Sequence, residues 1–349
     1  MSPFQQCLDQ WRAEVAVPLV AGSVRFDASL VWHGVSMAED SDNSDGVASQ
    51  SRFPIYSITK TFTAVCVLRL DKAGLLSVHD PITKWMTDLP DLPLPESVTL
   101  SHLLRHVSGV PDYGPLREYH EAVRTTPKSP WTDDEFLNAT LAQGLLFEPG
   151  TGWSYSNVGY LLIRRAIEKA AGRNFRRCVD EQIASPLGLT STFVAETIDD
   201  WQCCVPGYGR EVRIDGEAVD IRSSYHPGWC APGVAVSTAD EITMFYDGLF
   251  TGALLDEPRL EQMLQLIRVP GAHPPAVTPS YGMGIMADPD GLFGPSYGHG
   301  GGGPGYSLFA SIVPQSPRGR LSVAVFCNNS FGADAKWGAH ALCQVATAA

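Results

Sequence analysis

The sequence has no run of basic residues and no long apolar stretch. Its 349 residues carry 38 acidic against 25 basic side chains, which gives a formal net charge of -13. Because proteins bind the phosphate backbone of nucleic acids through clustered Lys and Arg, this balance argues against a nucleic-acid partner. A membrane-spanning helix needs about 18 apolar residues in a row. No segment approaches that length, so we expect no membrane partner either.

The sequence also lacks a metal-binding pattern. Its eight cysteines are scattered and include no C-x-x-C pair and no Cys/His cluster of the kind that holds zinc. The adjacent Cys203 and Cys204 would make a poor chelate, and Cys66 and Cys327 lie in apolar surroundings typical of small core residues. We therefore expect neither a metal nor a cofactor.

The first residues lack the basic segment and apolar core of a secretion signal. Instead, Phe4, Leu8, Trp11 and Val15 recur at helical spacing and predict a surface helix. From these observations we expect a soluble, cytoplasmic protein.

The composition, with 44% apolar and 18% charged residues, is that of a globular protein with a substantial core. At this length one large domain and two interleaved domains are both open. Alternating apolar residues at 24–32 predict one half-buried strand, and the acidic tract at 39–46 predicts an exposed loop. The apolar segment that begins near Ser57 predicts a buried helix ending at Gly74.

From about residue 80 to 225 the pattern is mainly helical. Thr99 or Ser101 and Thr132 are expected to cap helix N-termini, and Gly172 is expected to end a helix.

The remaining part of the chain is predicted to be rich in strands. Thr238 and Glu241 have the spacing of a capping box, and strand-like segments follow at 281–287, 305–313 and 321–328, before a last helix at 335–346. The order predicts an α/β (α+β) sandwich, an antiparallel β-sheet flanked by helices, with an inserted all-α subdomain. We expect residues 1–76 and 225–349 to form the sandwich and residues 77–224 the helical subdomain.

Ser57 and Lys60 stand three residues apart at the head of the most apolar predicted helix. At this spacing the two side chains share one helix face, near the positive end of the helix dipole. Burial and the dipole both disfavour an ammonium group, so Lys60 is predicted to act as a base on the Ser57 hydroxyl. The alternative is a chance Ser-x-x-Lys match.

Tyr155 and Asn157 lie two residues apart in WSYSNVGY, directly before a predicted helix. In an extended loop such side chains point the same way. A phenol can relay a proton, and an amide can hold a substrate carbonyl and steady Lys60. The alternative is that Tyr155 only packs and that Asn157 caps the helix.

His299, Gly300 and Gly301 stand near the start of GHGGGGPGYS, where a strand is predicted. Consecutive glycines would let a substrate approach the edge of a strand closely. The alternative is a plain glycine-rich turn. The segment lacks the strand, turn and helix context of a dinucleotide site.

In this order, Ser-x-x-Lys, Tyr-x-Asn and His-Gly-Gly resemble the motifs of the serine β-lactamase and penicillin-binding-protein superfamily. Stretches such as VTLSHLLRHVSGVPDY and FEPGTGWSYSNVGYLLI are similar to ones typical of its class C β-lactamase-like branch of esterases, D-peptidases and transacylases. The resemblance implies a β-lactamase/transpeptidase-like fold with an active-site cleft between the helical subdomain and the sandwich.

The resemblance also implies a role for each motif. Ser57 would be the nucleophile, with Lys60 and Tyr155 transferring protons. The substrate would be bound by Asn157, His299, Gly300 and Gly301. The oxyanion would be bound by the backbone N–H groups of Ser57 and Gly302.

The third motif departs from the Lys-Thr-Gly or His-Thr-Gly of many relatives. Gly300 has no hydroxyl, and a His at position 299 is mostly neutral near pH 7, so recognition of a substrate carboxylate is disfavoured. The leading hypothesis is a serine hydrolase or acyltransferase that takes a small-molecule ester, amide or acyl donor. A β-lactamase or D-stereospecific peptidase and a catalytically silent ligand-binding protein are the alternatives.

Overall fold

The structure, a computed structural model, describes residues 2–39, 50–89, 92–142 and 144–348. The acidic loop expected at 39–46 lies outside these ranges apart from its first residue. The main feature is an antiparallel sheet of eight strands in the order β2-β1-β13-β12-β11-β10-β9-β8. Its strands are β1 (Leu19–Phe26), β2 (Ser29–Met37), β8 (Ile267–Arg268), β9 (Ser280–Tyr281), β10 (Met286–Asp288), β11 (Ser296–Gly303), β12 (Tyr306–Ser316) and β13 (Gly319–Cys327).

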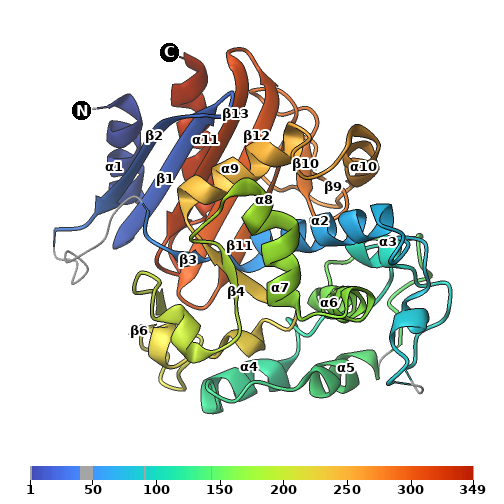
Figure 1. Ribbon diagram of the computed structural model, residues 1–349. Helices are drawn as coiled ribbons and strands as arrows, with labels where there is room; N and C mark the ends of the chain where they lie inside the picture. The colour runs from blue at the N-terminus through green and yellow to red at the C-terminus, as the bar shows by residue number, and fades with distance from the viewer. Residues whose placement is uncertain (1, 40–49, 90–91, 143, 349) are drawn as a thin grey trace.

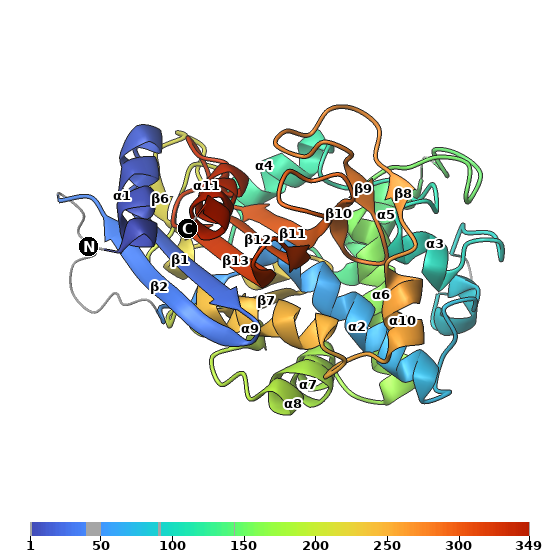
Figure 2. The same ribbon diagram turned by 90° about the horizontal axis from the view of Figure 1, so that it is seen from above.

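Helices cover both faces of this sheet (Figure 1, Figure 2). Helices α1 (Pro3–Val15) and α11 (Ala335–Ala348) pack on one face, and α9 (Ala239–Phe250) packs on the other. Strand β1 is therefore buried on both sides, with Leu19 and Ala21 in one core cluster and Val20 and Val24 in the second. Burial on both faces explains why such strands are nearly continuous apolar runs.

The single strand expected at 24–32 is wrong, because the chain reverses there. Asp27 and Ala28 have φ values of 45° and 69° and join β1 to β2 as a hairpin. The alternation that suggested one strand runs through the turn. Val24 and Trp32 are paired across the two strands, whereas Ala28 lies in the turn and Leu30 is 39% exposed.

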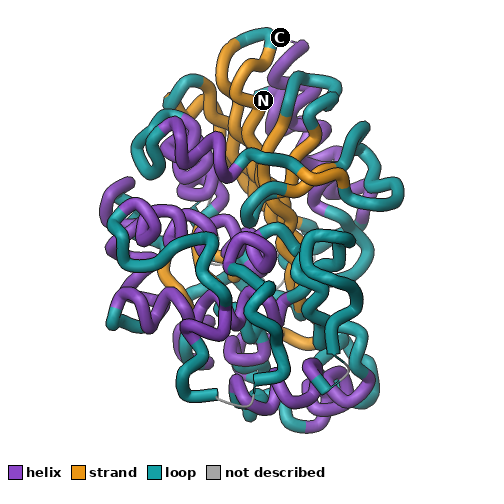
Figure 3. Tube along the Cα trace, turned by 90° about the vertical axis from the view of Figure 1, so that its right-hand side faces the viewer, coloured by secondary structure: helices purple, strands orange, loops and turns teal. Residues whose placement is uncertain are grey.

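The middle of the chain contributes most of the remaining helices, gathered at the end opposite the termini (Figure 1, Figure 3). They are α3 (Leu100–Leu104), α4 (Arg117–Thr125), α5 (Asp133–Leu141), α6 (Asn157–Ala171), α7 (Phe175–Val179), a π-helical turn (Asp180–Ala184) and α8 (Ser185–Leu187). Short strands interrupt this mainly helical range. One of them, β4 (Phe193–Ala195), joins β3 (Phe53–Pro54) and β7 (Val234–Ser237) in a three-stranded sheet, and β5 (Tyr208–Gly209) pairs with β6 (Val219–Asp220).

The predicted helix caps are largely confirmed. Thr99, not Ser101, caps α3, Thr132 caps α5, and Gly172 ends α6 in the left-handed conformation that favours glycine. Thr238 accepts a hydrogen bond from the backbone N–H of Glu241, but the Glu241 carboxylate accepts from Ser191 and Thr192 instead of completing a capping box.

The helix expected from Ser57 begins two residues later, as α2 (Thr59–Lys72), and Gly74 follows with a φ of 71°. Helix α2 is buried on nearly every face, which explains its almost uninterrupted apolar sequence. A 3₁₀ turn, η1 (Tyr56–Ile58), precedes it and lies against β11. Helix α10 (Glu257–Met263) completes the set. None of the described helices is long and apolar enough to cross a bilayer.

Candidate active site

Ser57 lies in the turn between β3 and α2, held by an unusual backbone conformation of the residue before it. Tyr56 has a φ of 43°, which is uncommon for a residue with a side chain. Its ring is buried, and its hydroxyl donates a hydrogen bond to the carbonyl of Pro304, just beyond β11, at 2.5 Å. This tether fixes the η1 turn, and with it Ser57, against the end of β11.

Ser57, Lys60 and Tyr155 meet although Tyr155 is distant in sequence. Lys60 Nζ donates to Ser57 Oγ at 3.2 Å, and the Tyr155 hydroxyl donates to the same oxygen at 2.9 Å. The ammonium nitrogen also lies 4.8 Å from the centre of the Tyr155 ring. Lys60 is only 3% exposed, so its contacts with these groups are shielded from bulk water.

Asn157 is a second hydrogen-bond partner of Lys60. Its Oδ1 accepts a hydrogen bond from Lys60 Nζ at 2.7 Å. The interpretation of Asn157 as a helix cap is wrong, because Ser156 caps α6 and accepts from the N–H of Gly159. The Asn157 amide is therefore free to contact the lysine.

Asp112 is a part of this cluster that the sequence reading missed. It accepts hydrogen bonds from the backbone N–H of Asn157 at 2.8 Å and from Asn157 Nδ2 at 3.1 Å. The amide of Asn157 is thereby oriented with its oxygen toward Lys60. Burial raises the pKa of the Asp112 carboxyl, although the hydrogen bonds from Asn157 and the charge of Lys60 act in the opposite direction. The only sequence signal was its place in VTLSHLLRHVSGVPDY.

His106, in the same stretch, supports Tyr155 and was missed as well. Its ring lies 4.2 Å from the Tyr155 ring, centre to centre, and its Nδ1 accepts from the backbone N–H of Ser156 at 3.1 Å. Burial lowers the pKa of His106 well below its usual value, so the ring is neutral. Tyr155 thus both packs, as the alternative reading had it, and contacts Ser57.

His299 lies on β11 and has no exposed surface, and its ring centre is 6.5 Å from that of Tyr155. Its Nε2 lies 2.9 Å from the Tyr281 hydroxyl, and its Nδ1 lies 2.6 Å from the carbonyl of Gly300. The carbonyl can only accept, so Nδ1 carries the proton and Nε2 accepts from Tyr281. Burial lowers the pKa of His299 to about 3. A direct contact between this side chain and a substrate, as we expected, has no support in this arrangement.

The glycines of β11 are explained by neighbouring backbone and rings. A Cβ on Gly301 would lie 2.4 Å from the carbonyl oxygen of Ile55, and one on Gly303 would lie 2.3 Å from the Tyr56 ring. These two positions need glycine for packing against η1. Close approach of a substrate to the glycine run stays a prediction. Gly300 and Gly302 are not crowded, since the nearest atoms to a Cβ lie at 3.6 Å for Gly300 and beyond 4 Å for Gly302.

A cavity of about 170 Å³ adjoins the cluster and is lined by Ser57, Lys60, Asn157 and Gly302. Its other walls include five aromatic residues, with Cys230 and several Gly and Pro residues; the aromatic set is Tyr56, Tyr113, Tyr119, Tyr225 and Trp229. Among the described residues, Lys60 is the only charged side chain that lines it. The cavity therefore suits an uncharged group attached to a carbon that Ser57 can reach.

No group of three or more His, Cys, Asp or Glu side chains within the described ranges is arranged to hold a metal ion. The chemistry on offer is that of a serine hydroxyl between a lysine and a tyrosine.

An antiparallel sheet with helices on both faces and a Ser, Lys and Tyr cluster beside one strand defines a β-lactamase/transpeptidase fold. The chain belongs to the beta-lactamase family, whose model matches residues 4–345. Across solved structures it is similar to a D-stereospecific amidohydrolase from Streptomyces sp., with a TM-score of 0.82 and 26% identity over 98% of this chain and 97% of that one. A D-amino acid amidase from Ochrobactrum anthropi SV3 has the same fold, with a TM-score of 0.81, 24% identity and coverage of 99% and 97%.

Among curated proteins the chain is similar to penicillin-binding protein 4* of Bacillus subtilis, with 28% identity over 80% of this chain and 61% of that protein. It is also similar to esterase EstB of Burkholderia gladioli, with 30% identity over 53% of this chain and 48% of that protein. The chain thus spans about three fifths of the length of the first relative and about half of the second.

Proposed function

We propose that this chain is a serine hydrolase or acyltransferase that forms an acyl ester on Ser57 and takes small, uncharged esters or amides. The observation that carries the proposal is the placement of Ser57 Oγ within hydrogen-bond distance of both Lys60 Nζ and the Tyr155 hydroxyl. A serine hydroxyl is a weak nucleophile until a neighbouring base takes its proton.

In the first half of the reaction, one of Lys60 and Tyr155 starts in its unprotonated form. Ser57 Oγ attacks the substrate carbonyl carbon, and its proton passes to that unprotonated group. The bond from that carbon to the leaving alcohol or amine then breaks, and the leaving group takes the proton. In the second half, water or an acceptor alcohol or amine attacks the acyl ester and gives its proton to the same pair. Ser57 Oγ leaves and is reprotonated, which restores the site.

Backbone N–H groups of Ser57 and Gly302 are the proposed donors to the oxyanion of both tetrahedral intermediates. Both residues line the cavity. Backbone donors do not depend on side-chain identity, so a glycine run is compatible with such a hole.

The uncharged substrate class is inferred from the walls of the cavity. A substrate carboxylate would need a cation other than the catalytic lysine, and the described lining supplies none. Arginines elsewhere in the 205–225 segment are engaged: Arg213 pairs with Asp215, and Arg222 pairs with Asp220. Arg210 lies over the ring of Phe331.

A second candidate is hydrolysis of amides or peptides of D-amino acids. It is favoured by the similarity over nearly the whole chain to the Streptomyces D-stereospecific amidohydrolase. A β-lactamase activity and a catalytically silent ligand-binding protein are the remaining alternatives. The division into a sandwich (1–76 and 225–349) and a helical subdomain (77–224), and the cytoplasmic location, also stay proposals.

The test combines covalent labelling with a substrate panel. A fluorophosphonate should add one label to Ser57 in the unmodified protein and none in Ser57→Ala, as read by intact-protein and peptide mass spectrometry. p-Nitrophenyl esters, D-amino acid amides and a chromogenic cephalosporin are then compared, each with and without an added alcohol or amine acceptor. Labelling at a residue other than Ser57, or equal turnover by Ser57→Ala, would refute the proposal.

A further inference from the structure

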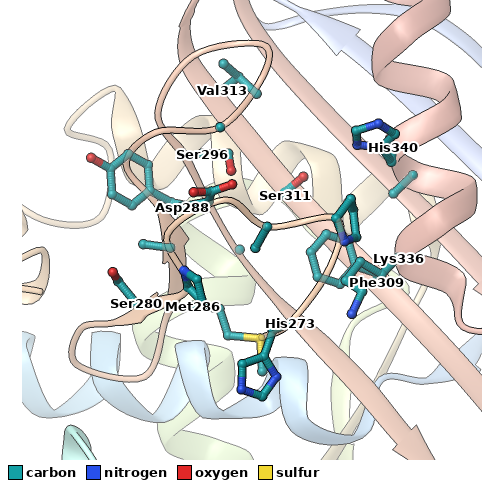
Figure 4. Close-up of a pocket in the computed structure, with 18 of the residues that line it drawn as sticks. His273, Ser280, Met286, Asp288, Ser296, Phe309, Ser311, Val313, Lys336 and His340 are labelled. Carbon is teal, nitrogen blue, oxygen red and sulfur yellow. The ribbon is translucent and has the colours of Figure 1, made fainter. Parts of the chain in front are cut away.

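A second, larger cavity lies on the other face of the sheet, between the ends of β9 to β12 and helix α11. It has a volume of about 230 Å³ and, among the described residues, shares no lining residue with the cavity beside Ser57. Its floor is formed by Phe309, Ser311 and Val313 of β12, and one wall by Ala339 and Cys343 of α11. Figure 4 shows lining side chains of this cavity, among them Met286, Phe309 and Lys336.

The walls are mainly apolar and so is part of the rim. Leu292, which is 71% exposed, and Met286, which is 36% exposed, both line the cavity. At the rim of an apolar cavity, these two side chains extend the apolar surface that a ligand can cover. A cavity of roughly 150 Å³ with apolar walls is enough to bind benzene, so this larger cavity can accept a ring or an alkyl chain.

The charged groups around the cavity are unevenly placed. Lys336 stands on α11 beside Phe309, and Asp288 lies across the cavity from it (Figure 4). The Asp288 carboxylate accepts hydrogen bonds from the backbone N–H groups of Val277 and Thr278 and is 8% exposed, so it is already satisfied. Within the part of the chain that the structure describes, Lys336 forms an ion pair only with Asp334, at 3.2 Å, and that carboxylate is more than half exposed.

Two histidines also line the cavity. Burial lowers the pKa of His340, so this ring does not add a second cation near pH 7. His273 is exposed, and its Nε2 lies 3.0 Å from the carbonyl of Pro270. Lys336 is therefore the fixed positive charge of the lining within the described residues.

We propose that this cavity binds an amphipathic monocarboxylate, with its alkyl chain or ring against the apolar walls and its carboxylate on Lys336 Nζ. The apolar walls account for the tail, and the cation at the α11 side accounts for the charge of the head group. The site is separate from the proposed catalytic cluster and does not depend on the reaction assigned to it.

A ligand in this cavity would touch two side chains, Tyr281 and Trp153, that contact the histidines next to Tyr155. Tyr281 lines the cavity and bonds to His299 through its hydroxyl, and Trp153 lines it and packs on His106. Both histidines in turn contact the ring of Tyr155.

The experiment is a calorimetric titration of Ser57→Ala with octanoate, with octanol as the uncharged ligand of the same chain length. Octanoate is expected to bind one site and to bind more tightly than octanol. Lys336→Met should weaken the binding of octanoate about tenfold, because one hydrogen bond to a charged group is lost. The affinity for octanol should not change. Asp334→Asn is the matched control: it breaks the same ion pair but keeps the lysine, and it should not weaken octanoate.

Ala339→Phe fills the cavity from α11 and should abolish binding of both ligands. Thermal unfolding checks that this variant is folded. If it is not, the variants Lys336→Met and Asp334→Asn still test whether Lys336 binds the carboxylate. Unchanged octanoate affinity in Lys336→Met, or equal weakening by Asp334→Asn, would overturn the proposal. So would binding that persists in a folded Ala339→Phe, because octanoate would then occupy the cavity beside Ser57 or another surface.

Discussion

Lys60 Nζ lies closer to Oδ1 of Asn157, at 2.7 Å, than to Oγ of Ser57, at 3.2 Å. The asparagine, itself oriented by Asp112, thus fixes the lysine, and the serine meets a base whose position is already set. Such preorganisation lowers the reorganisation needed when the proton moves. It makes the proposed roles of the cluster separable by mutation.

Tyr155→Phe should lower kcat for a p-nitrophenyl ester by roughly 10² to 10⁴-fold, the range for a group that transfers protons. The ring and its packing on His106 are kept, so the stability of the protein should hardly change. Steady-state kinetics and thermal unfolding measure the two effects. Near-normal kcat would mean that Tyr155 only packs.

Asp112→Asn should lower kcat through Asn157 while KM changes little. The new amide cannot accept from both N–H groups of Asn157 as the carboxylate does, and loss of a buried hydrogen bond of about 1–3 kcal/mol corresponds to a roughly ten- to hundredfold decrease. Asn157→Ala is the comparison, and the double variant should be no worse than the more severe single variant. Independent, multiplicative losses would show that Asp112 acts by another route.

The elements that sequence reading located best are those whose signal is local. The caps at Thr132 and Gly172 depend on neighbouring residues only, and the motif order of Ser57, Tyr155 and His299 was enough to predict the family and the fold. Asp112 and His106 were missed because their stretch, although typical of the family, does not show which of its residues reach the cluster. Only the packing of their loop against the start of α6 brings them to the cluster.

The burial of a residue under other side chains was the second limit. His299 shares a face of β11 with Gly301 and Gly303, which pack against η1, but its neighbours Tyr281 and Tyr155 come from other parts of the chain. His299 was therefore expected at the substrate, whereas it is buried against Tyr281.

Buried neutral histidine should make stability depend on pH. Because the pKa of His299 is lowered to about 3, the unfolded chain, with a histidine pKa near ~6.5, binds more protons between these values. Stability should therefore rise from pH 3 to about 6.5 and level off above. Urea unfolding measures the free energy of unfolding at pH 7.5 and at pH 5.5. The decrease in this free energy between the two pH values should be about 1 kcal/mol smaller in His299→Gln than in the unmodified protein. Equal pH slopes would contradict the buried neutral state.

Cys203 should be the most reactive thiol. The hydrogen bond from Cys204 and the charge of Arg52 lower the pKa of Cys203 to about 6, and its side chain is exposed. In contrast, burial raises the pKa of Cys343 to about 12 and that of Cys230 to about 11. One equivalent of iodoacetamide at pH 7 should therefore label Cys203 first, with a rate that is half-maximal near pH 6, as peptide mass spectrometry measures. Arg52→Gln should move that midpoint upward.

The substrate preference should follow from two groups that the third motif lacks, a hydroxyl at position 300 and a fixed cation at position 299. Neutral short-chain aryl esters should be turned over faster than a cephalosporin, whose carboxylate meets no charged partner other than Lys60 among the described lining residues. Gly300→Thr restores a hydroxyl at a position where the nearest atom to a new Cβ lies at 3.6 Å, so the strand can accommodate it.

The ratio of kcat/KM for a chromogenic cephalosporin to that for a p-nitrophenyl ester should rise in Gly300→Thr by up to roughly tenfold, the effect of about one hydrogen bond. Gly300→Ala is the matched control, since it adds the carbon without the hydroxyl and should leave the ratio unchanged.

Adding His299→Lys, which sequence reasoning alone would suggest, should instead destabilise the protein. It would bury an ammonium group where the ring of His299 now bonds to Tyr281, close to the charge of Lys60. A cephalosporin preference in the unmodified protein would refute this account of specificity, and the cation that binds the carboxylate would then have to be sought outside the described lining of the Ser57 cavity.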